Sequence, residues 1–97
     1  MIDRAAILSK ILDERIRQND LPGAEYDLTN GPNDWSSIAA KYLTEDAKRR
    51  GIIPCAEAYQ QSLLKAGAVI LAALEHIDHM VSEGKLSAGK LSAGKLK

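Results

Sequence analysis

Residues 62–78 read SLLKAGAVILAALEHID, and this stretch decides the fold. Between Leu63 and Leu74 it is apolar nearly all round a helix, with Lys65 as the exception. A helix of that kind is normally buried on several sides. Because the helical spacing continues in both directions, we predict one long helix over residues 54–82, roughly 40 Å in length.

Two further helices are predicted before this one. Residues 4–18 carry a single apolar stripe, and Asp3 is placed to cap their N-terminus. Residues 35–50 form the second helix, with Asn33 or Asp34 as its cap. The inner face of the second helix is expected to consist of Trp35, Ile38, Ala39, Tyr42, Leu43 and Ala47.

Residues 19–34 separate the first two helices and are predicted to form a loop. They contain the turn signals Pro22-Gly23 and Asn30-Gly31-Pro32. A loop of this length is unusual in so small a domain, and such loops are often functional. Both a functional role and a simple spacer over one end of the helices are consistent with the sequence.

The composition limits the size of the core. The chain has 97 residues, of which 45% are hydrophobic and 4% aromatic, so it forms one domain with a core of aliphatic side chains. Two short helices cannot enclose the long third one. We therefore expect an all-α fold with three helices per chain, the third longest, associating into an oligomeric helical bundle, a homodimer or larger.

Charge divides the chain into residues 1–84, the helical domain, and residues 85–97, a flexible Lys-rich tail. The tail contains four Lys, no acidic residue and the pentapeptide SAGKL twice, a composition typical of disorder. Residues 1–84 retain 9 of the 13 basic side chains and all 13 acidic ones. An acidic body does not favour nucleic-acid binding, which usually needs a basic face.

Neither a signal peptide nor a membrane span is predicted. The longest apolar run, residues 66–74, is far shorter than the roughly 20 residues that cross a bilayer. Cys55 is the only cysteine, so no disulfide can form within the chain, as is usual in a reducing cytosol. We expect a cytoplasmic protein in which Cys55 serves as a small buried apolar residue.

The order of features resembles a known family. The sequence ERIRQ (Glu14–Gln18) closes the first helix, a turn-rich loop follows, and Trp35 opens WSSIAAKYLTE before the apolar stretch at 62–78. Over residues 4–78 this series resembles the MazG-like nucleotide pyrophosphohydrolases, in particular the short versions common in phage and prophage genomes. The resemblance implies a helical, oligomeric protein that handles nucleotides.

In that family two helices carry the carboxylates of a metal site. A Glu-Glu-x-x-Glu motif lies on the second helix and a Glu-x-x-Asp motif on the third. Such carboxylates hold Mg²⁺, a hard cation that prefers oxygen ligands. The metal ions clamp the triphosphate and activate water for attack on phosphorus.

Position by position, this chain departs from the family at the metal site. The Glu-Glu pair falls on Lys41 and Tyr42, and the third Glu falls on Glu45, which keeps its carboxylate. The second motif falls on Ser62 and Lys65. One carboxylate of five remains and two positions carry ammonium groups, so no catalytic residue, metal or cofactor is predicted.

The resemblance thus implies a catalytically degenerate protein that binds a nucleotide or a host protein without hydrolysing nucleoside triphosphates. Two interpretations of the altered site remain open. In the first, Lys41 and Lys65 form salt bridges with Glu45 across the two helices. Alternatively, Lys41, Lys65, Glu45 and Tyr42 form a phosphate-binding site in which each Lys acts as a point charge.

Two other functions are consistent with the sequence. The first is an interaction or inhibitor module without a nucleotide ligand. The second is an active nucleotide pyrophosphohydrolase whose metal site forms between chains, from Glu45, Glu57, Glu75 or Asp78. The segment EHIDHM at 75–80 also groups His76 and His79 with two carboxylates, either as transition-metal ligands or as a solvated helix end.

Overall fold

The computed structural model describes residues 2–45 and 53–89. These residues form helical elements only, which confirms the all-α class. The elements are α1 (Arg4–Asn19), the 3₁₀ helix η1 (Ala24–Thr29), α2 (Pro32–Glu45), α3 (Ala56–Glu75) and α4 (Ile77–Ser82). The predicted count of three helices is wrong, because η1 is an additional element and the long third helix is divided in two.

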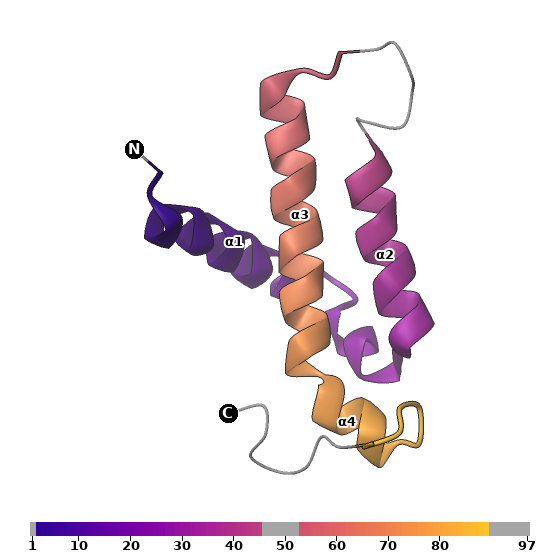
Figure 1. Cartoon of the computed structure of the whole chain (residues 1–97). Helices are drawn as coiled ribbons and strands as arrows, with labels where there is room; N and C mark the ends of the chain where they lie inside the picture. The colour runs from indigo at the N-terminus through magenta and orange to yellow at the C-terminus, as the bar shows by residue number, and fades with distance from the viewer. Residues whose placement is uncertain (1, 46–52, 90–97) are drawn as a thin grey trace.

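Helix α3 is the centre of the molecule, with α1 and α2 on opposite sides of it (Figure 1). Helix α2 runs antiparallel to α3, whereas α1 crosses α3 at an angle and its N-terminal half projects away (Figure 1). The core lies between α2, α3 and α4. Its buried residues are Trp35, Ala39, Val69, Ala72 and Met80, against which Tyr42, Ala73, Ile77 and Leu86 pack.

Helix α1 begins and ends close to the predicted positions. Its cap is Asp3, whose Oδ1 accepts a hydrogen bond of 3.0 Å from the Ala6 backbone N–H, as the sequence predicts. The helix approaches α3 where Ile11 lies over Gly67, and a Cβ added at Gly67 would be 3.5 Å from the Ile11 side chain, an ordinary contact. Ile11 and Gly67 therefore mark the crossing point of α1 and α3.

The segment between α1 and α2 is shorter and more structured than predicted. Residues 24–29 form η1, which follows Gly23 in a left-handed conformation with φ of 96°. Helix α2 begins at Pro32 rather than residue 35, with proline in its favoured first position. The Asp34 carboxylate reaches back to accept a 2.8 Å bond from the Gly31 N–H, which stabilises this earlier start.

The predicted single helix over residues 54–82 is broken at His76. In a regular helix the Ala72 carbonyl would accept the His76 backbone N–H. Here His76 Nδ1 occupies that carbonyl at 2.7 Å, and the His76 N–H bonds to Ala73 instead at 3.1 Å. The side chain thus replaces the backbone in the hydrogen-bond ladder, and α4 continues in a new direction (Figure 1).

Helix α4 ends in a tight turn that returns the chain to the core. Gly84, with φ of 75°, donates to Val81, and the Lys85 N–H donates to Met80 at 2.8 Å, the pattern of a Schellman motif. Leu86 then packs on the core. The first residues of the predicted tail therefore belong to the folded domain, and residues 90–97 lie outside the described residues.

Exposure corrects two expectations. Cys55 is exposed at the N-terminus of α3, rather than buried. On the predicted inner face of α2, Trp35 and Ala39 are buried, but Ile38 and Leu43 are 37% and 43% exposed. No helix among the residues that the structure describes is long and apolar enough to cross a membrane.

Candidate functional site

The structure separates the four residues of the predicted phosphate site into two groups. Tyr42 and Lys65 meet between α2 and α3, with the Lys65 Nζ 5.9 Å from the centroid of the Tyr42 ring. Lys41 and Glu45 are exposed on α2. Because successive residues are rotated by about 100° around a helix, Lys41 cannot share the direction of Tyr42.

The salt bridges expected among these residues do not form. None of Lys41, Glu45 and Lys65 takes part in an ion pair within the part of the chain that the structure describes. The Lys65 ammonium instead lies at the outer limit of a cation–π contact with Tyr42. It is a half-buried cation beside an aromatic ring, at the boundary of two helices.

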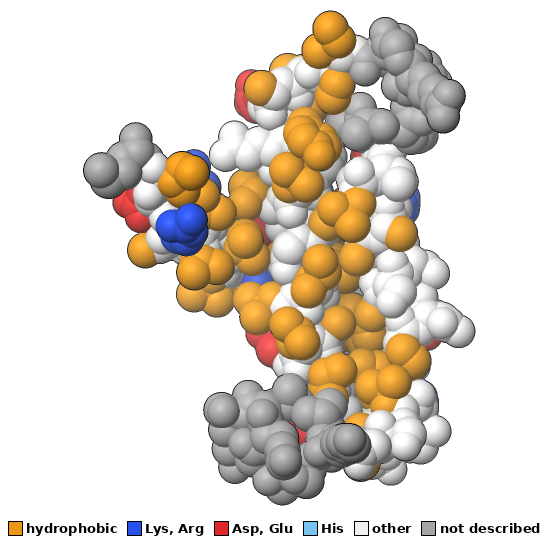
Figure 2. Space-filling view, in the orientation of Figure 1, with side chains coloured by type: hydrophobic (Ala, Val, Ile, Leu, Met, Phe, Trp, Pro, Cys, Tyr) orange, Lys and Arg blue, Asp and Glu red, His pale blue; other side chains and the backbone are white. Residues whose placement is uncertain are grey.

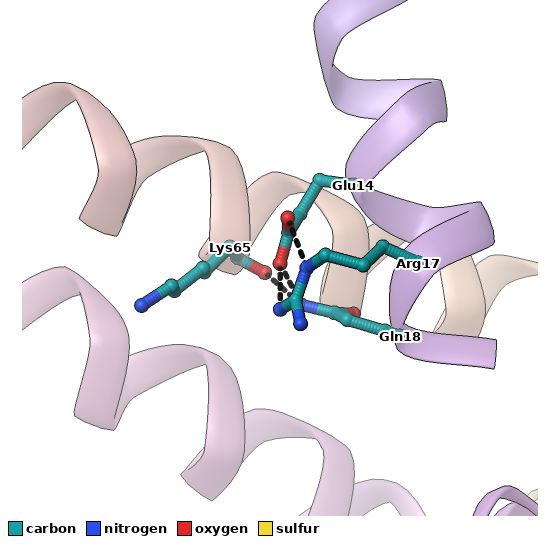
Figure 3. A network of polar contacts seen from close by, with 4 residues as sticks. All are labelled: Glu14, Arg17, Gln18 and Lys65. Carbon is teal, nitrogen blue, oxygen red and sulfur yellow. Dashed lines mark hydrogen bonds and ion pairs between the residues drawn. The ribbon is translucent and has the colours of Figure 1, made fainter. Parts of the chain in front are cut away.

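A polar network around Glu14 joins the end of α1 to α3 (Figure 3). Both Glu14 carboxylate oxygens accept bonds from Arg17, at 2.8 and 2.6 Å, and Gln18 donates to Glu14 at 3.1 Å. Gln18 also donates to the Lys65 backbone carbonyl at 3.4 Å. The Lys65 ammonium extends away from this network and makes no hydrogen bond in it (Figure 3).

The charge of this network is fixed at neutral pH. Hydrogen bonds from Arg17 hold the pKa of the Glu14 carboxyl below its usual value, which outweighs the opposite effect of burial. The positive charges of Arg17 and Lys65 and the bond from Gln18 lower that pKa further. Glu14 is therefore ionised and acts as an acceptor only.

An ion pair that the sequence analysis missed connects α1 to the end of α3. Arg15 is buried, with 7% of its surface exposed, and donates through Nε and an Nη to Glu75 Oε1 at 3.1 and 2.7 Å. Its position four residues after Ile11, on the side of α1 that faces α3, was the available signal. One carboxylate oxygen of Glu75 is thereby engaged within the chain.

The other candidate metal ligands point to different partners. His76 bonds to its own helix and lies against the Trp35 ring, with centroids 5.3 Å apart. His79 Nε2 is 3.1 Å from the Leu28 carbonyl and 3.6 Å from a Glu83 carboxylate oxygen. Within the described ranges 2–45 and 53–89, no group of three or more His, Cys, Asp or Glu is arranged to hold a metal ion.

A small cleft of about 220 Å³ lies where α1, η1, α2 and α3 meet. Tyr42 lines it together with Gln18 and Asp27, and Lys65 lies over that same tyrosine. Trp35 also lines the cleft, and its buried Nε1–H has no hydrogen-bond partner among the described residues. The cleft combines an aromatic wall with a nearby cation.

The face of the molecule shown in Figure 2 carries an extended apolar surface. Hydrophobic side chains gather along α3 and over the adjoining parts of α1 and α2. We define this apolar face by its large members, which are 41–65% exposed: Leu8, Leu12, Ile16, Leu43, Leu63, Ile70 and Leu74. All are aliphatic, so the face offers packing surface but no group for acid–base chemistry.

The apolar face contains a groove of about 340 Å³ between α2 and α3. Leu43 and Ala40 form one wall, and Ile70 and Leu74 form the other. The small side chain of Ala40 and that of Ala73 leave the groove open. Its dimensions suit apolar side chains that project from a helix.

Comparison of the chain with protein-family models, with curated proteins and with solved structures gives no match.

Proposed function

We propose that this protein is a cytoplasmic helical interaction module whose apolar face binds another protein chain. The observation that carries the proposal is the apolar face itself, which extends across three helices (Figure 2). Soluble chains rarely leave a contiguous apolar patch of this kind uncovered, and such patches mark protein interaction sites. The homo-oligomer expected from the sequence fits this face, because two chains would each cover the other's patch.

Covering the apolar face is energetically favourable. Burying a Leu or Ile side chain completely is worth about 1.5–3 kcal/mol. Leu8, Leu12 and Ile16 each keep half or more of their surface exposed, and Ile70 and Leu74 keep about as much. A partner that covers them therefore gains roughly 1 kcal/mol for each side chain, which is unrealised in the isolated chain.

The proposal also holds that the chain is not a metal-dependent hydrolase. In this proposal the resemblance to MazG-like proteins reflects common descent. The chain is of phage origin and has lost the catalytic activity of the family. The support is the residue at each motif position: Lys41, Tyr42, Ser62 and Lys65 replace carboxylates, and the one retained carboxylate, Glu45, is exposed on α2. Ammonium groups repel Mg²⁺ where the family's carboxylates would bind it.

The test compares the wild-type chain with the double variant Leu12→Lys/Leu74→Lys, each immobilised on a sensor. One arm passes the same chain over the surface, and a second arm passes an extract of the cells that encode it, with retained proteins identified, purified and retested. We expect saturable binding in at least one arm that the double variant loses. Equal signals from both surfaces in both arms would contradict the proposal.

A second candidate function, binding of a nucleotide phosphate without hydrolysis, is favoured by one observation. The half-buried Lys65 ammonium lies over Tyr42 at the edge of the cleft and forms no ion pair with a carboxylate among the described residues. An aromatic wall and an accessible cation suit a base and a phosphate respectively.

This second candidate is tested by calorimetric titration with a nucleoside triphosphate, with and without Mg²⁺. We expect binding that does not need Mg²⁺ and that Lys41→Glu/Lys65→Asp abolishes, whereas the exposed control Lys10→Glu retains it. Unchanged affinity in the double variant would refute phosphate binding at these lysines. Mg²⁺-dependent release of pyrophosphate would instead support an active enzyme with a metal site between chains.

A further inference from the structure

We infer that the chain covering the apolar face is a second copy of this protein, and that α1 of each copy packs into the α2–α3 groove of the other. This inference rests on the proposed function, because it names the partner of the same face. It specifies a closed, two-fold dimer in which the same two contacts occur twice.

The projecting element is the N-terminal half of α1. Every described residue from Ile2 to Lys10 is exposed, including Leu8 at 65%. Leu8, Leu12 and Ile16 recur every four residues and form one ridge along the helix. Helices of this length are marginal in water without packing, so an apolar ridge on a projecting helix requires a surface to rest on.

The receiving element is the groove between α2 and α3. Figure 2 shows hydrophobic side chains over α1 and along the boundary of α2 and α3 on one face of the molecule. It is about 340 Å³ in volume and lined by Leu43, Ile70 and Leu74 with small alanines between them. Ridges formed by residues four apart pack into grooves between side chains of a neighbouring helix. One molecule therefore carries both halves of a complementary contact.

The arrangement of the helices determines the symmetry axis. Helices α1 and α2 lie on opposite sides of α3 (Figure 1). When two copies meet face to face about a two-fold axis parallel to α3, the α1 side of one copy lies opposite the α2 side of the other. Each ridge is thereby placed on the partner's groove. The two α3 helices then lie parallel on either side of the axis.

The exposed area is sufficient for this dimer. A standard interface buries roughly 800 Å² per partner. That area is about one tenth of the 7366 Å² that the chain exposes. The large side chains that define the apolar face are all aliphatic, so no like charges oppose each other among them when two copies meet.

The experiment measures the mass of the purified full chain by sedimentation and light scattering from micromolar to millimolar concentration. The two test variants are Leu8→Lys on the ridge and Ile70→Glu in the groove. Their matched controls are Asp13→Lys and Ser37→Glu, which introduce the same side chains at exposed positions outside the apolar face. Circular dichroism of each variant checks that the helices are retained.

We expect wild type and both controls at twice the 10.5 kDa chain mass. Each test variant alone should dissociate roughly tenfold or more readily, because a charge enters an apolar contact twice per dimer. Mixing the two variants should restore association, since one contact is then native and the other pairs Lys with Glu.

Three results would overturn the inference: a monomeric wild type at every concentration, test variants that associate as well as their controls, or no recovery on mixing. A monomeric wild type combined with face-dependent binding of a different purified protein would refute the second copy as the occupant and leave the proposed function standing. Loss of face-dependent binding of every kind would refute both.

Discussion

The buried Arg15 is a single residue whose contacts help to fix the position of α1 against α3. Its guanidinium donates two hydrogen bonds to one oxygen of Glu75, and the pair ties α1 to the C-terminal end of α3. The sequence analysis did not predict this pair, because the two residues are 60 positions apart and either charge could have faced solvent. In contrast, the local cap at Asp3 was predictable, since its partner lies only three residues away.

Removing the Glu75 charge should destabilise the fold. In Glu75→Gln the buried Arg15 loses its counter-charge, and we expect a loss of about 1–2 kcal/mol. The loss is smaller than for a fully buried pair, because the Glu75 side chain is 44% exposed and solvent screens it. Thermal unfolding at one protein concentration measures the effect, and Asp13→Asn on the exposed side of α1 is the control. An unchanged melting temperature in Glu75→Gln would show that Arg15 needs no partner.

The Glu14 network predicts a dependence on acid pH. Because the pKa of Glu14 is lowered in the folded state, its ionised form contributes stability above the ordinary Glu pKa of about 4.3. That contribution is lost as the pH falls through the lowered, folded-state pKa. We therefore expect Glu14→Gln to melt below wild type at pH 7 and to approach it at low pH. A difference in melting temperature that stays constant across this range would contradict the assignment.

At the scale of elements, the presence of the main helices was predictable from the sequence, whereas the positions at which helices break or begin were not. The apolar spacing located α1, α2 and α3, because burial of a helix face leaves a periodic signal in the sequence. The break at His76 leaves no such signal, since it depends on a ring nitrogen that takes the Ala72 carbonyl. The early start of α2 was concealed by Pro32, which is typical both of turns and of the first helical position.

Two glycines should respond to alanine in opposite ways. Gly67 lies within α3, and an added Cβ would make an ordinary contact with Ile11 at 3.5 Å. We expect Gly67→Ala to stabilise the protein by about 0.5–1 kcal/mol. Gly84 has open space around it but a φ of 75°, so Gly84→Ala should cost about 1 kcal/mol. Chemical denaturation measures both, and effects of the same sign would refute this account of the α1–α3 crossing or of the α4 turn.

For the whole molecule, composition predicted the all-α class and a core too small to cover α3. It could not predict which face of α3 stays uncovered, because that depends on the angle at which α1 crosses at Gly67. The predicted phosphate site met the same limit. Alignment of the chain with the family's motifs assigns Lys41 and Lys65 to one site. In the structure Lys41 is exposed on α2, whereas Tyr42, the next residue of that helix, faces Lys65 on α3.

The parallel arrangement of α3 across a two-fold axis can be measured through the native cysteine. Cys55 is exposed directly before α3, so a nitroxide attached there reports on the N-terminal ends of both α3 helices. Helices in contact are about 8–10 Å apart, and we predict a dipolar distance between labels shorter than about 25 Å. An antiparallel pair would separate the labels by the length of α3, roughly 30 Å or more. Such a separation, or the absence of any dipolar coupling at high concentration, would contradict the dimer.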